Sequence, residues 1–284
     1  MILGRPHKAG TLNRIPAYAV KLALFSALGA CASTSAVTPA APPVVPKVYI
    51  ASDSTASDYA ASRYPQSGWG SFIGCVLTGV KVDNRAIGGR STRTFIEEDR
   101  WNGIRTNLKT GDTVLIQFGH NDATQAKPER FAAPTTSYRQ NLVSFIADVR
   151  AAGAVPVLVT PVARRSFDGI RAKADFAQYS AVMRDVAKGS GVALVDLETS
   201  SRQMLDELGL EGSKPYFLHY EKGAYTAFPD GIADDTHFSE LGARRVANLV
   251  ATGIAQSGIP LARRVSSDRS DLLRAAPLGS RQCR

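Results

Sequence analysis

The chain contains a histidine–aspartate spacing that is suited to proton transfer. Only four histidines occur in its 284 residues: His7, His120, His219 and His237. Asp234 stands three residues before His237, so within one turn of chain its carboxylate can reach the imidazole Nδ1. That contact holds the tautomer whose Nε2 accepts a proton, as a general base requires. Asp235, two residues before His237, is expected to project away from that nitrogen in most backbone conformations.

A general base in ester hydrolysis needs a nucleophile, and Ser54 is the candidate. It lies in Asp53-Ser54-Thr55, directly after an apolar run. No Gly-x-Ser-x-Gly motif occurs in the sequence, which argues against the α/β-hydrolase arrangement. No cysteine pair and no His-x-x-x-His occurs either, so no metal site is expected. Each motif alone is weak, since an Asp-x-x-His is more often a capping carboxylate beside a surface imidazole.

From Lys47 onward, short β-rich runs alternate with helical patterns. Several of the β-rich runs are continuously apolar, which is typical of parallel strands covered on both faces. The predicted strands cover residues 48–52, 81–87, 113–118, 155–160 and 192–197. Apolar residues recur at helical spacing over 142–149, before Gly153, and over 246–254, behind Ser239 as a helix N-cap. This pattern predicts one doubly wound α/β domain whose site lies beyond the carboxyl ends of its strands.

The segments that follow the predicted strands carry a family resemblance. They are, in order, Ser52-Asp53-Ser54-Thr55, Pro65-Gln66-Ser67-Gly68-Trp69-Gly70, Asn84-Arg85-Ala86-Ile87-Gly88-Gly89-Arg90-Ser91-Thr92-Arg93, Gly111-Asp112-Thr113-Val114-Leu115-Ile116-Gln117-Phe118-Gly119-His120-Asn121-Asp122, and Asp234-Asp235-Thr236-His237-Phe238. With these segments the chain resembles the SGNH or GDSL hydrolase superfamily, and within it the rhamnogalacturonan acetylesterases. The resemblance spans about residues 47–255.

The resemblance implies a fold and a set of site residues. The fold would be a three-layer α/β/α arrangement with a flavodoxin-like, doubly wound parallel five-stranded sheet, and no cofactor would be needed. Ser54 would be the nucleophile, His237 the base and Asp234 its orienter. The oxyanion hole would consist of the backbone N–H of Ser54, the backbone N–H of Gly89 and the side-chain amide of Asn121.

Two positions depart from the superfamily pattern. Ser52 stands where the motif has glycine, which raises a question about the geometry of the turn. Asp235 stands beside the dyad, where a neutral residue is expected. Of the remaining histidines, His120 is expected to fix the loop next to Asn121, and His219 to lie at the surface in a rim loop within residues 212–233.

Ser54 would attack an acetyl carbonyl, which needs only a small pocket, so the surrounding surface is free to recognise the alcohol half. Four arginines at or just past strand ends are candidates for substrate binding: Arg90, Arg93, Arg164 and Arg165. An arginine fork suits a carboxylate, and pectic polymers carry one on each galacturonate. Alternatively, the arginines pair with the local acids Glu97, Glu98 and Asp168. Trp69 is a candidate sugar-stacking platform, although an aromatic residue after Ser67-Gly68 is more often in the core.

The net charge of +9 belongs mainly to the two ends of the chain. The first 31 residues hold four basic residues and no acid, and six arginines lie within the last 23 residues. The body between them is therefore nearly neutral. This distribution argues against nucleic-acid binding, which requires a basic face to neutralise phosphates.

The N-terminus has the pattern of a targeting segment. Basic residues precede the apolar stretch 22–30, and Leu28-Gly29-Ala30-Cys31 resembles a bacterial lipobox, in which Cys31 is acylated. The alternative is ordinary cleavage after Ala32. No apolar run reaches the roughly 18 residues of a membrane span, so membrane contact is expected only through a lipid anchor. Export, to the outer membrane as a lipoprotein or to the periplasm or medium, implies an oxidising compartment.

Four regions follow from these patterns. Residues 1–31 are predicted to be the signal peptide, 32–46 an Ala/Pro/Thr-rich tether, 47–260 the hydrolase domain, and 261–284 a basic, disordered tail. Within the domain, Cys75 lies in an apolar run and is expected to be a small buried hydrophobe. Cys283 falls in the predicted tail.

Three functions remain open on the sequence. The first is a serine esterase that removes O-acetyl groups from a cell-wall polysaccharide, pectic rhamnogalacturonan being favoured, through an acetyl-serine intermediate. The second is another SGNH activity, on xylan, envelope sugars, lysophospholipids or aryl esters. The third is a non-catalytic, surface-tethered glycan-binding module, against which the intact set of candidate catalytic residues argues.

Overall fold

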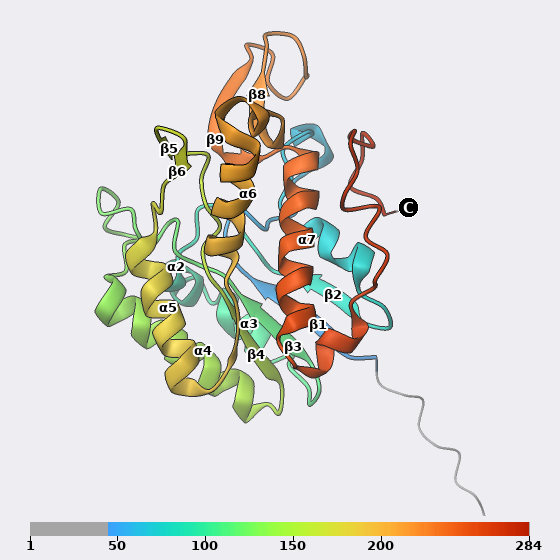
Figure 1. Ribbon diagram of the computed structural model, residues 1–284. Coiled ribbons are helices and arrows are strands. Elements are labelled where there is room, and N and C mark those ends of the chain that lie inside the picture. Colours follow the sequence, from blue (N-terminus) through green and yellow to red (C-terminus); the bar gives the residue numbers. More distant parts are fainter. Residues whose placement is uncertain (1–44, 284) are drawn as a thin grey trace, which may run out of the picture. The chain divides into compact units, whose positions relative to one another are not determined.

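A computed structural model describes residues 45–283, so the predicted signal segment, Cys31 and most of the tether lie outside the described residues. The central sheet has five strands, all parallel, in the order β2-β1-β3-β4-β7 (Figure 1). Their bounds are Lys47–Ala51 (β1), Lys81–Asn84 (β2), Thr113–Ile116 (β3), Val155–Val159 (β4) and Ala193–Val195 (β7). The flavodoxin-like five-stranded parallel sheet is confirmed.

Alternating side chains of the strands feed two separate cores, one on each face of the sheet. In β1, Val48 and Ile50 point to one core and Tyr49 and Ala51 to the other, as the two-residue period of a strand requires. The first core lies under α1 (Gly70–Ile73), α6 (Leu197–Gly212) and α7 (Glu240–Gln256). The second lies under α2 (Thr92–Glu97), α3 (Arg100–Arg105), α4 (Arg139–Ala151) and α5 (Ala177–Ser190). The domain is therefore a three-layer α/β/α structure (Figure 1).

Two short hairpins were not predicted from the sequence. Strands β5 (Phe167–Asp168) and β6 (Arg171–Ala172) form the first, and β8 (Phe217–Tyr220) and β9 (Ile232–Phe238) form the second, which projects beyond the sheet (Figure 1). Their strands are short or rich in Asp, His and Tyr, so no apolar run marks them. Single-turn helices occupy residues 61–63, 74–76, 134–138, 214–216 and 260–264. None of the helices in residues 45–283 is long and apolar enough to cross a membrane.

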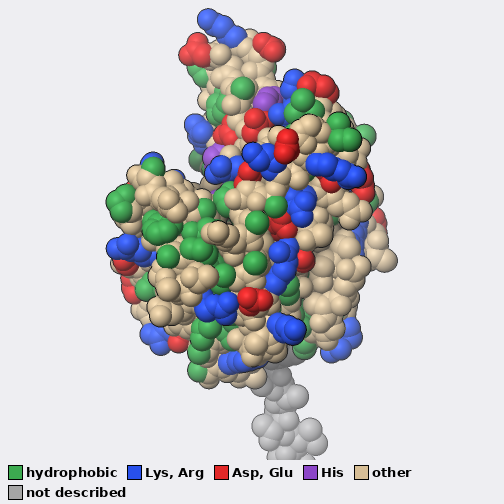
Figure 2. Space-filling view, turned by 60° about the vertical axis from the view of Figure 1, so that its left-hand side comes forward, with side chains coloured by type: hydrophobic (Ala, Val, Ile, Leu, Met, Phe, Trp, Pro, Cys, Tyr) green, Lys and Arg blue, Asp and Glu red, His purple; other side chains and the backbone are tan. Residues whose placement is uncertain are grey.

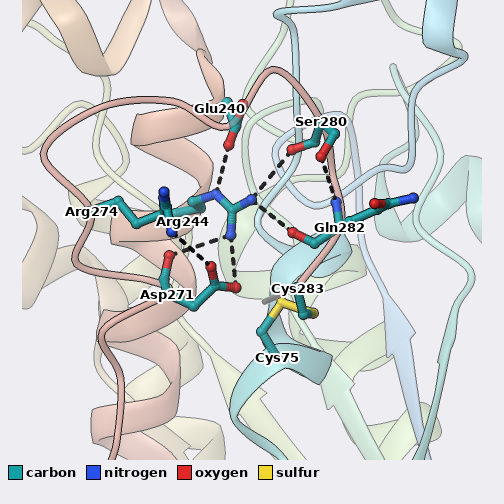
Figure 3. The surroundings of a disulfide bond; sticks show 8 residues. All are labelled: Cys75, Glu240, Arg244, Asp271, Arg274, Ser280, Gln282 and Cys283. Carbon is teal, nitrogen blue, oxygen red and sulfur yellow. Dashed lines mark hydrogen bonds and ion pairs between the residues drawn. A yellow bond between two sulfur atoms is a disulfide. The ribbon is translucent and has the colours of Figure 1, made fainter.

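The prediction of a disordered tail over 261–284 is wrong for the residues described. Leu261 and Leu272 are buried in the first core, and the Ser266 N–H donates to the Val76 carbonyl at 2.8 Å. Cys283 forms a disulfide with Cys75, so the expectation that Cys75 is simply a small buried hydrophobe is also wrong (Figure 3). The composition of the tail did not reveal these partners, because Val76 and Cys75 lie 190 and 208 residues away in the sequence.

Candidate active site

Ser54 lies in a tight turn directly after β1. The Ala56 N–H donates to the Asp53 carbonyl at 3.3 Å and closes the turn. The Asp53 carboxylate accepts from the backbone N–H and hydroxyl of Thr55, at 2.9 and 2.8 Å, which fixes the turn from inside the protein. The Tyr59 hydroxyl donates to the Ser54 carbonyl at 2.8 Å. Burial raises the pKa of Tyr59 above its ordinary range, so this donor keeps its proton.

His237 and Asp234 lie on β9, in the hairpin that projects beyond the sheet. His237 Nδ1 is 2.7 Å from Asp234 Oδ2, and the other carboxylate oxygen accepts from the backbone N–H groups of Thr236 and His237. Burial acts to raise the pKa of Asp234, but the hydrogen bonds from the His237 side chain and backbone and from Thr236 outweigh it and lower the pKa to about 2. A charged Asp234 accepts a hydrogen bond from Nδ1–H, which leaves the unprotonated Nε2 of His237 free to accept a proton.

Gly89 and Asn121 lie at the carboxyl edge of the sheet, after β2 and β3. Gly89 has a φ of 80°, and the Arg90 N–H donates to the Ile87 carbonyl at 3.4 Å. This is a turn that requires glycine at its third position. The Asn121 side-chain amide donates one hydrogen to the Arg90 carbonyl at 2.9 Å. An amide nitrogen carries two hydrogens, so the second remains for a ligand.

One pocket of about 450 Å³ brings these residues together. Its lining includes Ser54, Gly88, Gly89, Asn121, Arg130, Arg164 and His237. A serine hydroxyl, an imidazole and backbone and side-chain N–H donors therefore face one space, and the sequence analysis expected Ser54, His237, Gly89 and Asn121 to meet there. A larger cavity of about 880 Å³ lies along the projecting hairpin, but it contains none of these groups.

His120 also lines the pocket, and it holds the loop in place as expected. Its Nε2 is 2.8 Å from the Val162 carbonyl, which can only accept, so Nε2 carries the hydrogen. Burial lowers the pKa of His120 and keeps the ring neutral. The ring packs against Phe176 with centroids 4.1 Å apart.

The structure separates the four arginines proposed to bind substrate. Arg90 and Arg93 pair with the exposed acids Glu98 and Glu97, as the alternative interpretation expected. Arg165 is buried, so its assignment to substrate binding is wrong: it bonds Asp235 at 2.8 Å and the Leu210 carbonyl at 2.5 Å.

Arg164 remains in the pocket, and Arg130, which sequence analysis missed, joins it. Arg164 lies over the Phe176 ring at 5.1 Å, and Arg130 donates to the Thr124 hydroxyl at 3.3 Å. Within residues 45–283, no acidic group forms an ion pair with either guanidinium. On the side of the molecule that Figure 2 shows, basic and acidic side chains are interspersed.

The assignment of Trp69 as a sugar-stacking platform is also wrong. Trp69 is completely buried, and its indole N–H donates to Gln117 Oε1 at 2.6 Å. Ser52, which stands where the superfamily motif has glycine, also has a role here: its hydroxyl donates to the same Gln117 oxygen at 3.3 Å. Both side chains are therefore part of the buried packing beneath the turn that carries Ser54.

Asp235 points away from His237, as its position in the chain suggested. It lies 2.7 Å from His219 Nε2 and accepts from Arg165. The Arg165 backbone N–H also donates to the Asp235 carbonyl at 2.9 Å. Asp235 thus joins the projecting hairpin to the segment after β4. His219 belongs to a strand of that hairpin, where its side chain is about four-fifths covered, rather than to a surface loop.

Tyr59 and Gln66 are pocket residues that sequence analysis also missed. Both lie in the segment between the nucleophile turn and α1. Gln66 appeared among the residues of the family resemblance, but nothing in its type indicated a place in the pocket. Arg130 lay far from any predicted strand end, which is why the arginine search did not reach it.

A doubly wound sheet with a serine, a His–Asp pair and N–H donors at its carboxyl edge has the architecture of a serine ester hydrolase. The model of the GDSL-like lipase/acylhydrolase family matches residues 53–245. The chain belongs to this family, and it is a carboxylic-ester hydrolase.

Two relatives from Bacillus subtilis (strain 168) match most of both chains. A probable rhamnogalacturonan acetylesterase, YesY, is 40% identical over 223 residues, which are 78% of this chain and 98% of the relative. The rhamnogalacturonan acetylesterase RhgT is 42% identical over 217 residues, 76% of this chain and 92% of the relative.

Solved structures share the fold at lower identity. The YxiM protein of Bacillus subtilis superposes with a TM-score of 0.65 at 24% identity, covering 77% of this chain and 58% of the other. Axe2, an acetylxylan esterase from Geobacillus stearothermophilus, gives a TM-score of 0.53 at 17% identity, with 78% and 97% covered.

Proposed function

We propose that the protein removes O-acetyl groups from a pectic polysaccharide, rhamnogalacturonan, with Ser54 as nucleophile. The observation that carries the proposal is the pocket in which Ser54, His237 and Asn121 face two guanidinium groups that form no ion pair with an acid in the described part of the chain. The names of the two Bacillus relatives support the same substrate class.

The reaction begins with proton transfer. His237 Nε2 takes the proton of Ser54 Oγ as that oxygen attacks the acetyl carbonyl carbon. The negative charge that develops on the carbonyl oxygen is stabilised by the N–H groups of Ser54, Gly89 and Asn121, and one such donor contributes about 3 kcal/mol to lowering the barrier. Asp234 stays charged and stabilises the imidazolium.

Breakdown of the intermediate releases the sugar hydroxyl and leaves an acetyl-serine. His237 donates its proton to the departing sugar oxygen, which restores the neutral imidazole. The same nitrogen then takes a proton from water, which attacks the acetyl-serine. His237 then returns this proton to Ser54 Oγ as the serine–acetyl bond breaks, and the product leaves as acetic acid, which ionises to acetate in water.

Arg130 and Arg164 provide the recognition of the polymer. A guanidinium binds a carboxylate through two parallel hydrogen bonds, and galacturonate supplies a carboxylate on alternate residues of a rhamnogalacturonan backbone. The acetyl group itself is neutral and gives these arginines nothing to bind. Xylan chains and simple aryl esters lack such a regular carboxylate.

Acetate release from acetylated rhamnogalacturonan, acetylated xylan and O-acetylated peptidoglycan tests the proposal. We expect the highest kcat/KM on rhamnogalacturonan and no release by Ser54→Ala. A preference for xylan or peptidoglycan would contradict the pectic substrate. Full activity of Ser54→Ala would contradict the nucleophile.

We also propose that the protein is exported and carries a lipid on Cys31. The lipobox-like Leu28-Gly29-Ala30-Cys31 and the Cys75–Cys283 disulfide both support export, because disulfides persist in oxidising compartments. Membrane fractionation is the test: the wild-type protein should sediment with membranes and Cys31→Ala should not. A soluble mature protein that begins at Ser33 would show cleavage without lipidation.

A further inference from the structure

The C-terminal segment of the chain, residues 269–283, runs along α7 and ends beside α1; we call it the strap (Figures 1 and 3). It lies beyond residue 245, where the match to the family model ends. Its last described residue, Cys283, is covalently bonded to Cys75. Arg269 ties its beginning to α7 through a hydrogen bond of 2.6 Å to the Thr252 hydroxyl. The strap is therefore held at both ends.

A buried charge cluster attaches the middle of the strap to the first turns of α7. Arg244 is completely buried and donates to Glu240 Oε1 at 2.8 Å, to Asp271 Oδ2 at 3.0 Å and to the Gln282 carbonyl at 2.9 Å (Figure 3). Glu240 also accepts from the backbone N–H groups of Leu278 and Gly279, at 2.9 and 3.0 Å. Removing one partner of such a buried ion pair strongly lowers the stability of the fold, because the remaining charge is left buried and unpaired. The cluster begins three residues after His237.

Arg281 connects the strap to residues that line the pocket. Its guanidinium donates to three backbone carbonyls, those of Tyr59, Ala60 and Gln66. Tyr59 and Gln66 line the pocket, and the Tyr59 hydroxyl holds the Ser54 carbonyl. We call residues 59–66 the wall segment. It contains a single helical turn, residues 61–63, and backbone hydrogen bonds of 2.9–3.0 Å hold residues 60–66 together. The bonds from Arg281 fasten this segment to the strap.

We infer that the strap is a positioning element of the active site and that Arg281 is its positioning residue. Arg281 fixes the wall segment by binding three of its carbonyls at once. Tyr59, held in this way, positions the turn that carries Ser54, because its hydroxyl donates to the Ser54 carbonyl. The Cys75–Cys283 disulfide, two residues from Arg281, keeps the guanidinium in place. Small displacements of reacting groups have large effects on rate, so loosening this connection should reduce turnover. The inference rests on the proposed role of Ser54.

The test compares Arg281→Gln with Arg269→Gln, the same substitution in the same strap. With p-nitrophenyl acetate as substrate, well below the melting temperature, we expect Arg281→Gln to lower kcat about tenfold with little change in KM, because an acetyl group hardly touches the wall. Arg269→Gln, whose bonds reach α7 and not the wall, should lower Tm and keep kcat. Equal kcat in Arg281→Gln and wild type, or equal loss in both variants, overturns the inference.

A double-mutant cycle separates positioning from general loosening. If Arg281 acts through Tyr59, the effects of Arg281→Gln and Tyr59→Phe on kcat should be less than additive. Strictly additive effects contradict the proposed connection.

Cys283→Ser provides a second test of the inference, which also applies if Arg281→Gln does not fold. The variant keeps Arg281 but frees its end, and kcat should fall at least threefold. Dithiothreitol should do the same to wild type, since it reduces the disulfide to two thiols and is itself oxidised to its cyclic disulfide. Unchanged kcat in folded Cys283→Ser overturns the inference. Full activity of Ser54→Ala would instead contradict the proposed function, whereas inactive Ser54→Ala beside fully active Arg281→Gln contradicts the strap alone.

Discussion

Two neighbouring aspartates, Asp234 and Asp235, have opposite surroundings although they adjoin in the sequence. Asp234 is bonded to His237 and to two backbone N–H groups, whereas Asp235 is bonded to His219 and Arg165. Regular alternation along β9 would place Asp235 on the side of His237. The β8–β9 register shifts between Asp234 and Phe238, and the backbone there turns so that Asp234 reaches His237. The first aspartate can act on the base, and the second holds the hairpin to the body of the domain.

Substitution of the two aspartates should therefore have different effects on kcat. Asp234→Asn should lower kcat by orders of magnitude, though by less than Ser54→Ala or His237→Ala, because it removes the charge that stabilises the imidazolium. Asp235→Asn should change kcat little and lower Tm. Steady-state kinetics on p-nitrophenyl acetate measures both. A larger kcat effect from Asp235→Asn would show that the dyad is assigned to the wrong aspartate.

The low pKa of Asp234, about 2, fixes the pH range over which it contributes. A carboxylate with a depressed folded-state pKa stabilises the protein above its ordinary value near 4, and this contribution is lost as the pH falls toward 2. Asp234 should thus stay charged throughout the neutral and mildly acidic range. We expect the difference in unfolding free energy between wild type and Asp234→Asn to be constant from pH 6 to 8 and to shrink below pH 4, as denaturant titrations can measure.

Arg130 and Arg164, the two arginines that line the pocket, allow a separate prediction about substrate binding. Arg130→Gln and Arg164→Gln should each raise KM on acetylated rhamnogalacturonan several-fold, because each removes a carboxylate fork. Hydrolysis of neutral p-nitrophenyl acetate should stay nearly unchanged, and Arg93→Gln, on an exposed ion pair, is the matched control. Added salt should weaken activity on the polymer through screening over about 10 Å at 0.1 M. Equal losses on both substrates would show that the arginines support the loops instead.

At the scale of elements, Asp122 joins the end of β3 to the start of α2. Its Oδ1 accepts from the backbone N–H and hydroxyl of Thr92, at 2.9 and 2.5 Å. Thr92 follows the Gly89 turn closely, and Asn121 precedes Asp122, so this contact ties the two loops of the predicted oxyanion hole together. Burial raises the pKa of Asp122 to about 7, although the bonds from Thr92 act to lower it.

This raised pKa predicts a pH-dependent stability. Between about pH 4 and 7 the unfolded chain gives up the Asp122 proton while the folded protein retains it, so rising pH costs the folded state up to about 4 kcal/mol. Asp122→Asn keeps an acceptor for Thr92 and removes this titration. The unfolding free energy of the variant minus that of wild type should therefore increase from pH 5 to pH 8. A difference independent of pH would show that Asp122 does not titrate in this range.

At the scale of the whole molecule, one disulfide closes most of the folded chain into a loop. Cys75 and Cys283 are separated by 208 residues. Cross-links stabilise folded proteins mainly by restricting the unfolded chain, typically by 2–4 kcal/mol. We expect Cys75→Ser and Cys283→Ser to lower the unfolding free energy by about 2–4 kcal/mol, and the double variant to lose no more than either single one. Additive losses would show that the two cysteines are not bonded to each other.

The sequence by itself determined the parts of the protein that depend on local pattern. Short β-rich runs, several of them continuously apolar, located all five strands of the parallel sheet, and Ser239 was correctly placed as the N-cap of α7. The strand ends placed Ser54, Gly89 and Asn121 at one edge, because carboxyl ends of parallel strands share an edge. The spacing of Asp234 and His237 sufficed for their contact, since three residues of chain span it directly.

Only the tertiary structure decided which distant residues meet. Four arginines looked alike in the sequence, and only the structure showed that Arg165 is buried and paired with Asp235, whereas Arg164 lines the pocket. The strap has the composition of a disordered tail, yet Arg244 and Cys75 order it from elsewhere in the fold. An isolated segment of chain carries its own propensities but not its partners, and ion pairs, disulfides and pocket walls are formed between segments. How much these contacts stabilise the fold depends on how deeply their groups are buried, which a local sequence pattern does not show.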